Sequence, residues 1–404
     1  MAWPTKWWRS CRILVLASLL VLGGTAAAIA ENAPAQIRIA FVNPGKHDEF
    51  FWPAVSAAMQ AAADQFGFAL EIQYAERDAQ AIGRLGRAII ARAEPPDFLI
   101  LVNEFQAGAA LLRAADARGI KTVMLLNSFY GADAVTMGAP GAIYPHWIGS
   151  LIPDNRAAGR RMANALAACA RRTGAKGPDG KYHILALLGD STTPASLDRT
   201  DGMRATLAAH PDIVLDREFN TNWQTPKGHD LTANFLTWAA AHKMPTAGIW
   251  AANDALALGA IAAAEARQRH PGKDLCVVGL NWSPEALALV RDGKMEMTDG
   301  GHFLAGGWAM VMIHDYLAAP DEAAANALRR AITFEMAPID QGNVVQFFAR
   351  LGDRDWRRID FKRFSRQSDR PIPDGVLQRY GGYDFSLRET LEQTRPLPGD
   401  LSTN

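Results

Sequence analysis

The chain has 404 residues, with 42 basic (Lys, Arg) and 42 acidic (Asp, Glu) side chains, so its formal net charge is +0. A nucleic-acid-binding surface normally leaves a basic excess, and this balance therefore argues against nucleic acid as a partner. Hydrophobic residues make up 49% of the chain and charged residues 21%, a composition that excludes disorder as the main state. The length allows two or three domains of ordinary size.

Residues 1–30 are predicted to be a cleaved signal peptide. Lys6, Arg9 and Arg12 precede an apolar run from Ile13, and Ala28–Ala30 has the small-x-small form of a signal peptidase site. An uncleaved membrane anchor is the alternative, but the Ala/Gly-rich second half of the run is weakly hydrophobic. No later stretch reaches the roughly 18 apolar residues of a membrane span. We therefore expect a soluble mature protein in the periplasm.

The three cysteines are too few for a disulfide framework. Cys11 precedes the apolar run and leaves with the signal peptide. Cys169 falls in a predicted helix and Cys276 in a predicted buried strand. They could pair in an oxidising compartment, but two separate buried thiols are the simpler expectation.

Short apolar runs alternate with helical patterns along the rest of the chain, which predicts repeated βα units and parallel sheets covered by helices. The predicted strands are 37–42, 70–74, 98–102, 122–127, 184–188, 213–219, 247–252 and 275–281. The predicted helices are 53–66, 79–93, 106–118, 156–172, 195–209, 230–242, 255–269, 284–292 and 304–317.

This number of units predicts two α/β Rossmann-like doubly wound lobes of five to six strands each, joined by a hinge near Gly149–Asp154. Residues 31–150 and 300–331 are assigned to lobe 1, and residues 151–299 and 332–404 to lobe 2. Residues 332–340 could form a strand that crosses the hinge. Residues 350–366, which are charged and aromatic, are expected to pack on lobe 2. Ligands of such folds bind at the carboxyl ends of the strands, so a shared cleft is expected there.

Polar and aromatic residues follow several predicted strands, which indicates capture of a polyhydroxylated ligand. Amide, carboxylate and guanidinium groups can bond ring hydroxyls, and aromatic planes pack on the C–H faces of a sugar. Because three aromatic residues open the first helix, at least one of them should face the cleft. His302 adjoins a Gly-Gly pair at an expected strand exit, where a surface histidine is the more ordinary interpretation. The candidate ligand-binding residues are Phe50, Phe51, Asn127, Arg199, Trp223, Asn253, Asn281 and His302.

The sequence lacks the catalytic motifs of common enzyme classes. No GxSxG, GxxxxGK[ST] or HExxH motif occurs, no GxGxxG follows the first strand, and the nine histidines lack metal-ligand spacing. We therefore expect no enzymatic activity, no cofactor and no bound metal. A carboxylate pair for glycoside hydrolysis stays open as an alternative.

The chain resembles the type 1 periplasmic sugar-binding proteins, such as the ribose, galactose and autoinducer binders, from about residue 37 to residue 317. Motifs that carry the resemblance are Phe50-Phe51, Asp154-Asn155 with Gly159, Arg199 with Asp201-Gly202, Asn253-Asp254 with Gly259, Val278-Gly279-Leu280-Asn281 and Asp292-Gly293-Lys294. The resemblance implies that Arg199 and Asn253 touch the ligand.

Two positions depart from the family pattern. Asn127 and Asn281 stand where the family usually has aspartate, so Arg199 has less negative charge near it. This favours an acceptor-rich ligand such as a sugar acid, unless Asp190, Asp201 or Asp254 offsets the arginine.

The expected function is that of an exported, monomeric solute-binding protein that closes on a small ligand (a sugar, polyol or sugar acid). It would present this ligand to an ABC transporter permease, or to a membrane sensor kinase or chemoreceptor. The alternatives are an exported hydrolase acting on a sugar-like substrate, and the same fold reassigned to a non-sugar ligand.

Overall fold

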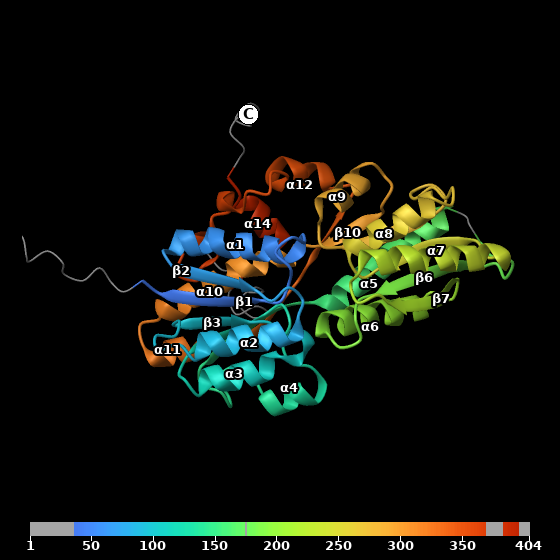
Figure 1. Cartoon of the computed structure of the whole chain (residues 1–404). Helices are drawn as coiled ribbons and strands as arrows, with labels where there is room; N and C mark the ends of the chain where they lie inside the picture. Colours follow the sequence, from blue (N-terminus) through green and yellow to red (C-terminus); the bar gives the residue numbers. More distant parts are fainter. Residues whose placement is uncertain (1–35, 174–175, 369–382, 396–404) are drawn as a thin grey trace, which may run out of the picture. The chain divides into compact units, whose positions relative to one another are not determined.

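The structure is a computed structural model that describes residues 36–173, 176–368 and 383–395 (Figure 1). The predicted signal peptide lies outside the described residues. From Arg38 onward the chain forms one compact unit. Within it are two six-stranded sheets with helices between their strands, so the prediction of two doubly wound sheets is confirmed. No helix in the described part of the chain is both long and apolar enough to cross a membrane.

The first sheet is parallel throughout and has the strand order β11-β5-β4-β3-β1-β2. Its strands are apolar over most of their length because helices cover both faces; β3, for example, is buried at every residue. The strands are β1 (Arg38–Asn43), β2 (Ala69–Tyr74), β3 (Phe98–Leu101), β4 (Lys121–Leu125), β5 (Trp147–Pro153) and β11 (Arg330–Phe334). The helices that accompany it are α1 (Phe51–Phe66), α2 (Ala79–Ile90), α3 (Gly108–Asp116), α4 (Gly131–Met137), α10 (Ala305–Leu317) and α11 (Glu322–Ala327).

The second sheet has the order β12-β10-β9-β8-β6-β7, and only its edge strand β12 is antiparallel. Its strands are β6 (Tyr182–Leu188), β7 (Ile213–Asn220), β8 (Thr246–Ala251), β9 (Cys276–Leu280), β10 (Met297–Gly300) and β12 (Ala337–Asp340). The accompanying helices are α5 (Asn155–Thr173), α6 (Pro194–Ala208), α7 (Thr225–Ala241), α8 (Asp254–Glu265) and α9 (Pro284–Arg291).

The chain passes between the sheets at three places, after β5, after β10 and between β11 and β12. The expected crossing strand at residues 332–340 is thus two short strands, one in each sheet, joined by Glu335 and Met336. The expectation that residue 332 begins lobe 2 is wrong, because Ile332 pairs with Leu151 of the first sheet.

The C-terminal segment packs on both halves of the unit, not on the second alone as the sequence suggested. Helix α12 (Val344–Leu351) contacts α9 and β12 of the second half. The short helices η3 (Trp356–Arg358) and η4 (Phe361–Phe364) instead contact α1 and α10 of the first half. Gln65 of α1 donates to the Ile359 carbonyl at 2.7 Å and accepts from the Phe361 amide at 2.9 Å. The Phe361 ring lies against Gly307, where a Cβ would stand 2.2 Å from it.

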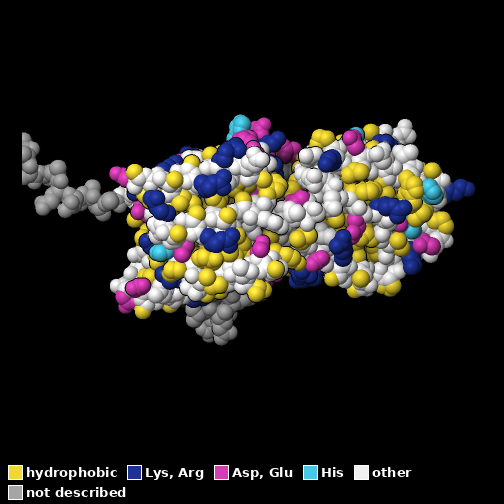
Figure 2. All heavy atoms as spheres, turned by 60° about the horizontal axis from the view of Figure 1, so that its bottom comes forward, with side chains coloured by type: hydrophobic (Ala, Val, Ile, Leu, Met, Phe, Trp, Pro, Cys, Tyr) yellow, Lys and Arg dark blue, Asp and Glu magenta, His cyan; other side chains and the backbone are white. Residues whose placement is uncertain are grey.

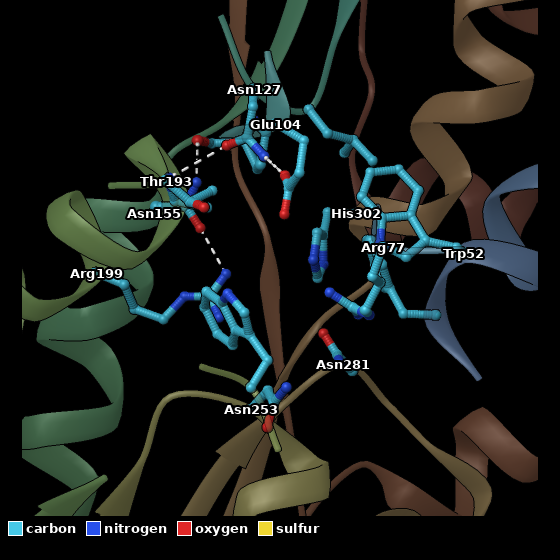
Figure 3. A pocket seen from close by; sticks show the side chains of 15 residues that line it. Trp52, Arg77, Glu104, Asn127, Asn155, Thr193, Arg199, Asn253, Asn281 and His302 are labelled. Atoms are coloured by element: carbon cyan, nitrogen blue, oxygen red, sulfur yellow. Dashed lines mark hydrogen bonds between the residues drawn. The ribbon is translucent and has the colours of Figure 1, made fainter. Parts of the chain in front are cut away.

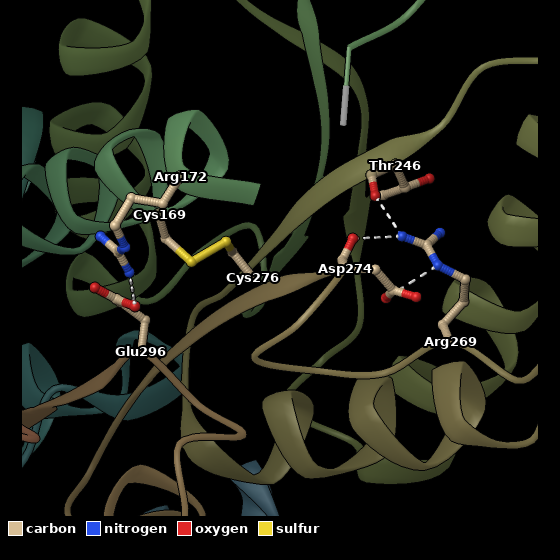
Figure 4. The surroundings of a disulfide bond; sticks show 7 residues. All are labelled: Cys169, Arg172, Thr246, Arg269, Asp274, Cys276 and Glu296. Atoms are coloured by element: carbon tan, nitrogen blue, oxygen red, sulfur yellow. Dashed lines mark hydrogen bonds and ion pairs between the residues drawn. A yellow bond between two sulfur atoms is a disulfide. The ribbon is translucent and has the colours of Figure 1, made fainter. Parts of the chain in front are cut away.

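Cys169 and Cys276 form a disulfide, so the expectation of two separate thiols is wrong (Figure 4). Helix α5 packs across β9, and this places the two Cα atoms 5.9 Å apart, within the range for such a bond. The sequence separation of 107 residues hid this proximity. Arg172 of the same helix also forms an ion pair with Glu296, just before β10, at 2.6 Å. This is a second contact between α5 and the second sheet.

Candidate functional site

A pocket lies where loops after strands of both sheets meet (Figure 3). Its empty space, with the open mouth included, is about 540 Å³. Seven of the eight candidate residues line it: Phe51, Asn127, Arg199, Trp223, Asn253, Asn281 and His302. The rule that ligands bind at the carboxyl ends of strands therefore located the pocket correctly, while contact of these residues with a ligand stays a prediction.

Phe50 is not among the residues that line the pocket. It precedes the first residue of α1, and the helical turn of 100° per residue sends its ring to another side. The ring lies edge-on to Phe303 at 6.4 Å, and the Arg354 guanidinium stands 4.8 Å from its centroid. Phe51 and Trp52 are the members of the aromatic trio that face the pocket.

Arg199 is buried in the wall of the pocket, on α6. Its terminal nitrogens donate to Asn155 Oδ1, at 2.7 Å, and to the Ala252 carbonyl, while its Nε is buried with no partner among the described residues. Burial lowers the pKa of Arg199 to about 10, and Asp299 and Asp254 act against this lowering. The side chain therefore remains a cation at neutral pH.

The buried aspartates decide between the two expectations for the charge near Arg199. Asp254, which one expectation named, acts on the arginine electrostatically, and so does Asp299, which is itself paired with Arg161 at 2.8 Å. Asp201 instead pairs with Arg156 at 2.9 Å, and Asp190 bonds Thr192, Thr193 and Trp223. The cation is thus partly compensated without help from a ligand.

Trp223 forms an aromatic wall beside Arg199, whose guanidinium carbon stands 5.8 Å from the ring centroid. Its indole N–H donates to Asp190 Oδ2 at 2.6 Å, and Gly189 leaves room for the ring, since a Cβ there would lie 2.2 Å from it. Burial acts to raise the pKa of Asp190, but hydrogen bonds from Thr193, Thr192 and Trp223 hold that pKa below its ordinary value. Asp190 is therefore ionised at neutral pH and holds the Trp223 indole by a hydrogen bond.

His302 is buried, and the interpretation of it as an ordinary surface histidine is wrong. Its ring lies 4.4 Å from that of Phe51, and its Nδ1 is buried with no partner in the described part of the chain. Burial, followed by the charge of Arg199, holds the pKa of His302 well below its ordinary value. The imidazole is neutral at pH 7 and can either donate or accept a hydrogen bond.

Asn253 and Asn281 present amides at the ends of β8 and β9. The Asn253 side-chain oxygen caps helix α8 by accepting from the Leu256 amide at 2.9 Å, which fixes the orientation of this side chain. Asn281 has a φ of 146° and is followed by Trp282 with a φ of 57°. A strained backbone of this kind persists only where the surrounding structure holds it in place. It is common at ligand sites.

Glu104 lines the pocket but was not among the residues predicted from the sequence, although it follows a strand as the other candidates do. Glu104 follows β3 and is buried, and Asn127 donates to its Oε2 at 3.1 Å. Burial raises the pKa of Glu104 to about 7, while Arg77 acts to lower it. Arg77, Asn155 and Thr193 also line the pocket and were not among the candidates. Arg77 carries two hydrogen bonds to Glu49, at 2.8 and 3.0 Å.

The lining suits a small polar ligand better than it suits hydrolysis. Glu104 is the one carboxylate among the residues that line the pocket, whereas glycoside hydrolysis ordinarily needs two. A possible metal-binding cluster in the described residues, His47 with Asp48 and Glu76, is exposed, and none of the three lines the pocket. The lining itself offers amides, a guanidinium and aromatic rings.

Comparisons with known proteins agree with this architecture. Residues 39–321 match the family model described as a periplasmic binding protein domain. The chain is 26% identical to the ribose import binding protein RbsB of Haemophilus influenzae over 288 residues, 71% of this chain and 86% of that protein. It is 33% identical to a periplasmic sugar-binding protein from Pseudomonas fluorescens, with a TM-score of 0.74 over 88% of this chain and 99% of that one. The arabinose-binding component of an ABC transporter from Shewanella sp. ANA-3 (22% identical, TM-score 0.64, 77% and 94% covered) shares the fold.

Proposed function

Because the chain belongs to the periplasmic binding protein family, we propose that it is an exported solute-binding protein that captures a sugar or polyol and delivers it to an ABC importer. One observation carries the proposal. Buried polar groups and aromatic rings from both sheets, among them Arg199, Asn127 and Trp223, line a single pocket at the strand ends. Hydrogen-bonding groups beside aromatic planes are what a polyhydroxylated ring requires.

The family relatives support a sugar as the ligand. Two of the relatives described above are a ribose import binding protein and a periplasmic sugar-binding protein. The amide and guanidinium groups of this pocket could bond several hydroxyls at once, while Trp223 and Phe51 would cover apolar faces of the ring.

Export to the periplasm is part of the proposal. Its support is the charged and apolar pattern of residues 1–30 together with the Cys169–Cys276 disulfide, since such bonds persist in oxidising compartments. The protein would act as a monomer and without catalysis, and a membrane sensor is the alternative partner to the importer.

Thermal shift and calorimetry with D-ribose, L-arabinose, D-allose and myo-inositol test the proposal. At least one of these should raise the melting temperature and bind with 1:1 stoichiometry, and Trp223→Ala should weaken that binding. Trp238→Ala is the matched control, because Trp238 lies on α7 against Phe235 and His242 and does not line the pocket.

Small-angle scattering then tests closure. Residues of both halves line the pocket, and only a closed state lets all of them contact the ligand. Saturating ligand should therefore favour the closed state and reduce the radius of gyration. If no sugar or polyol binds, or if bound ligand is chemically converted, the proposed function is wrong.

A further inference from the structure

Glu104 has one carboxylate oxygen committed to the protein and one that is free. Asn127 can offer only its amide N–H group to Glu104, because its own oxygen accepts from the Ala195 amide at 3.2 Å. That N–H group donates to Oε2, and Oε1 has no hydrogen-bond partner among the described residues. Figure 3 shows the carboxyl group of Glu104 pointing into the cavity. The fixed orientation of Asn127 therefore leaves an acceptor facing the ligand space.

No cation of the described chain forms an ion pair with Glu104. Arg77, the basic residue that acts on it, is held in a two-point pair with Glu49. A buried carboxylate with a single hydrogen bond and no cationic partner is costly, and a second hydrogen-bond donor from the ligand would offset that cost. A carboxylate from the ligand would instead increase the free-energy cost, because two negative charges would then face each other.

We propose that Glu104 determines the ligand class of this pocket: its free Oε1 accepts a hydrogen bond from a hydroxyl or ammonium group, so the pocket takes neutral or amino polyols and rejects sugar acids. This inference rests on the proposed function. It replaces the sequence-based expectation of an acidic ligand, because Asp254 and Asp299 already act on Arg199. Both terminal nitrogens of that arginine are also bonded to protein oxygens.

The affinity for a donor ligand should rise with pH. Burial raises the pKa of Glu104 to about 7, so the carboxylate form that accepts most strongly gains population above that pH. The charged or titratable groups around Glu104 are Arg77 and Glu49 from the first half, Asp190 from the second, and Arg199 and His302 across the pocket. His302 is neutral throughout this range, so it does not contribute the change.

A matched set of probes tests the inference: D-glucose, D-glucosamine and D-glucuronate, with D-ribose and myo-inositol as further uncharged probes. Binding is measured by calorimetry at pH 6 and pH 8 for the parent, Glu104→Gln and Glu265→Gln. Glutamine keeps the shape and the acceptor for Asn127, but it turns an N–H donor toward the ligand. Glu265 pairs with Lys294 on the surface away from the pocket, so its variant should match the parent.

We expect the uncharged probes to bind the parent more tightly at pH 8 than at pH 6, and glucosamine to bind more tightly than glucuronate at both pH values. Glu104→Gln should weaken binding of the uncharged probes by about 10-fold or more and remove the pH dependence, since a hydrogen bond to a charged group is lost. The same variant should bind glucuronate more tightly than the parent does. Preference of the parent for glucuronate, or unchanged affinities in Glu104→Gln, would overturn the inference while leaving sugar binding intact. Failure of every probe to bind the parent would count against the proposed function itself.

Discussion

Removal of the disulfide between Cys169 and Cys276 should strongly lower the free energy of unfolding. In protein that begins at Glu31 these are the only two cysteines, so reduction or the double variant Cys169→Ala/Cys276→Ala affects this bond alone. The bond joins helix α5 to strand β9 and so restrains the unfolded chain over much of the second sheet.

The magnitude follows from the length of the closed loop. A separation of 107 residues gives a loop-closure entropy of about 16 cal/mol/K, or about 4.8 kcal/mol at 25 °C. Measured values for disulfides are typically about 2–4 kcal/mol, because unfolded chains keep some structure. We therefore expect the free energy of unfolding to fall by about 2 to 4.8 kcal/mol when the disulfide is removed.

Guanidinium unfolding followed by circular dichroism measures the loss in oxidised parent, reduced parent and the double variant. The reduced parent keeps both sulfur atoms, so its agreement with the alanine variant would separate the cross-link from the small cavities that alanine leaves. A loss below about 1 kcal/mol in both forms would refute the loop-closure reasoning.

Three further predictions concern the pocket and the C-terminal segment. Trp223→Ala should weaken sugar binding by about 1–3 kcal/mol in calorimetry, the scale of a lost aromatic contact, with unfolding almost unchanged; equal affinity would remove Trp223 from the ligand contacts. Burial raises the pKa of Asp254 from 3.8 to about 6, so the folded state holds this proton more tightly than the unfolded state does. The free energy of unfolding should therefore fall as pH rises from about 4 to about 6, and a parent-like slope in Asp254→Asn would contradict this. Phe361→Ala should cost about 3–5 kcal/mol of stability, because the ring is fully buried against Gly307; chemical denaturation showing less than about 1 kcal/mol would argue against tight docking.

The sheets could be predicted from the sequence because parallel strands buried on both faces appear as short apolar runs. The run at residues 98–102, for example, became β3. The strand β5 was missed as a strand and taken for the hinge, since WIGSLIP contains Gly, Ser and Pro between its apolar residues. The pairing of Ile332 with Leu151 depends on contacts across the fold, which local pattern does not encode.

The pocket was predictable to the extent that its residues follow strands. Asn127, Asn253 and Asn281 do so, and the same rule applied to residues just past 102 would have included Glu104. Arg77 likewise follows a strand, β2, so the same rule would have pointed to it; it lies in a turn where its own φ is 58°. The Cys169–Cys276 bond could not be found from the sequence pattern, since only the packing of α5 on β9 brings the two residues together.

The docking of the C-terminal segment means that the region matched by the family and the folding unit do not end at the same residue. The family match stops at residue 321, yet the Trp308 ring of α10 stacks on Phe385 at 5.0 Å, and Asp315 accepts from Ser365 and from the Arg366 amide. A chain cut at the end of the match would expose this apolar helix face and remove the hydrogen bonds that Ser365 and Arg366 donate to the buried Asp315. Anyone who transplants or truncates this protein should therefore keep the segment through Phe385 as part of the scaffold.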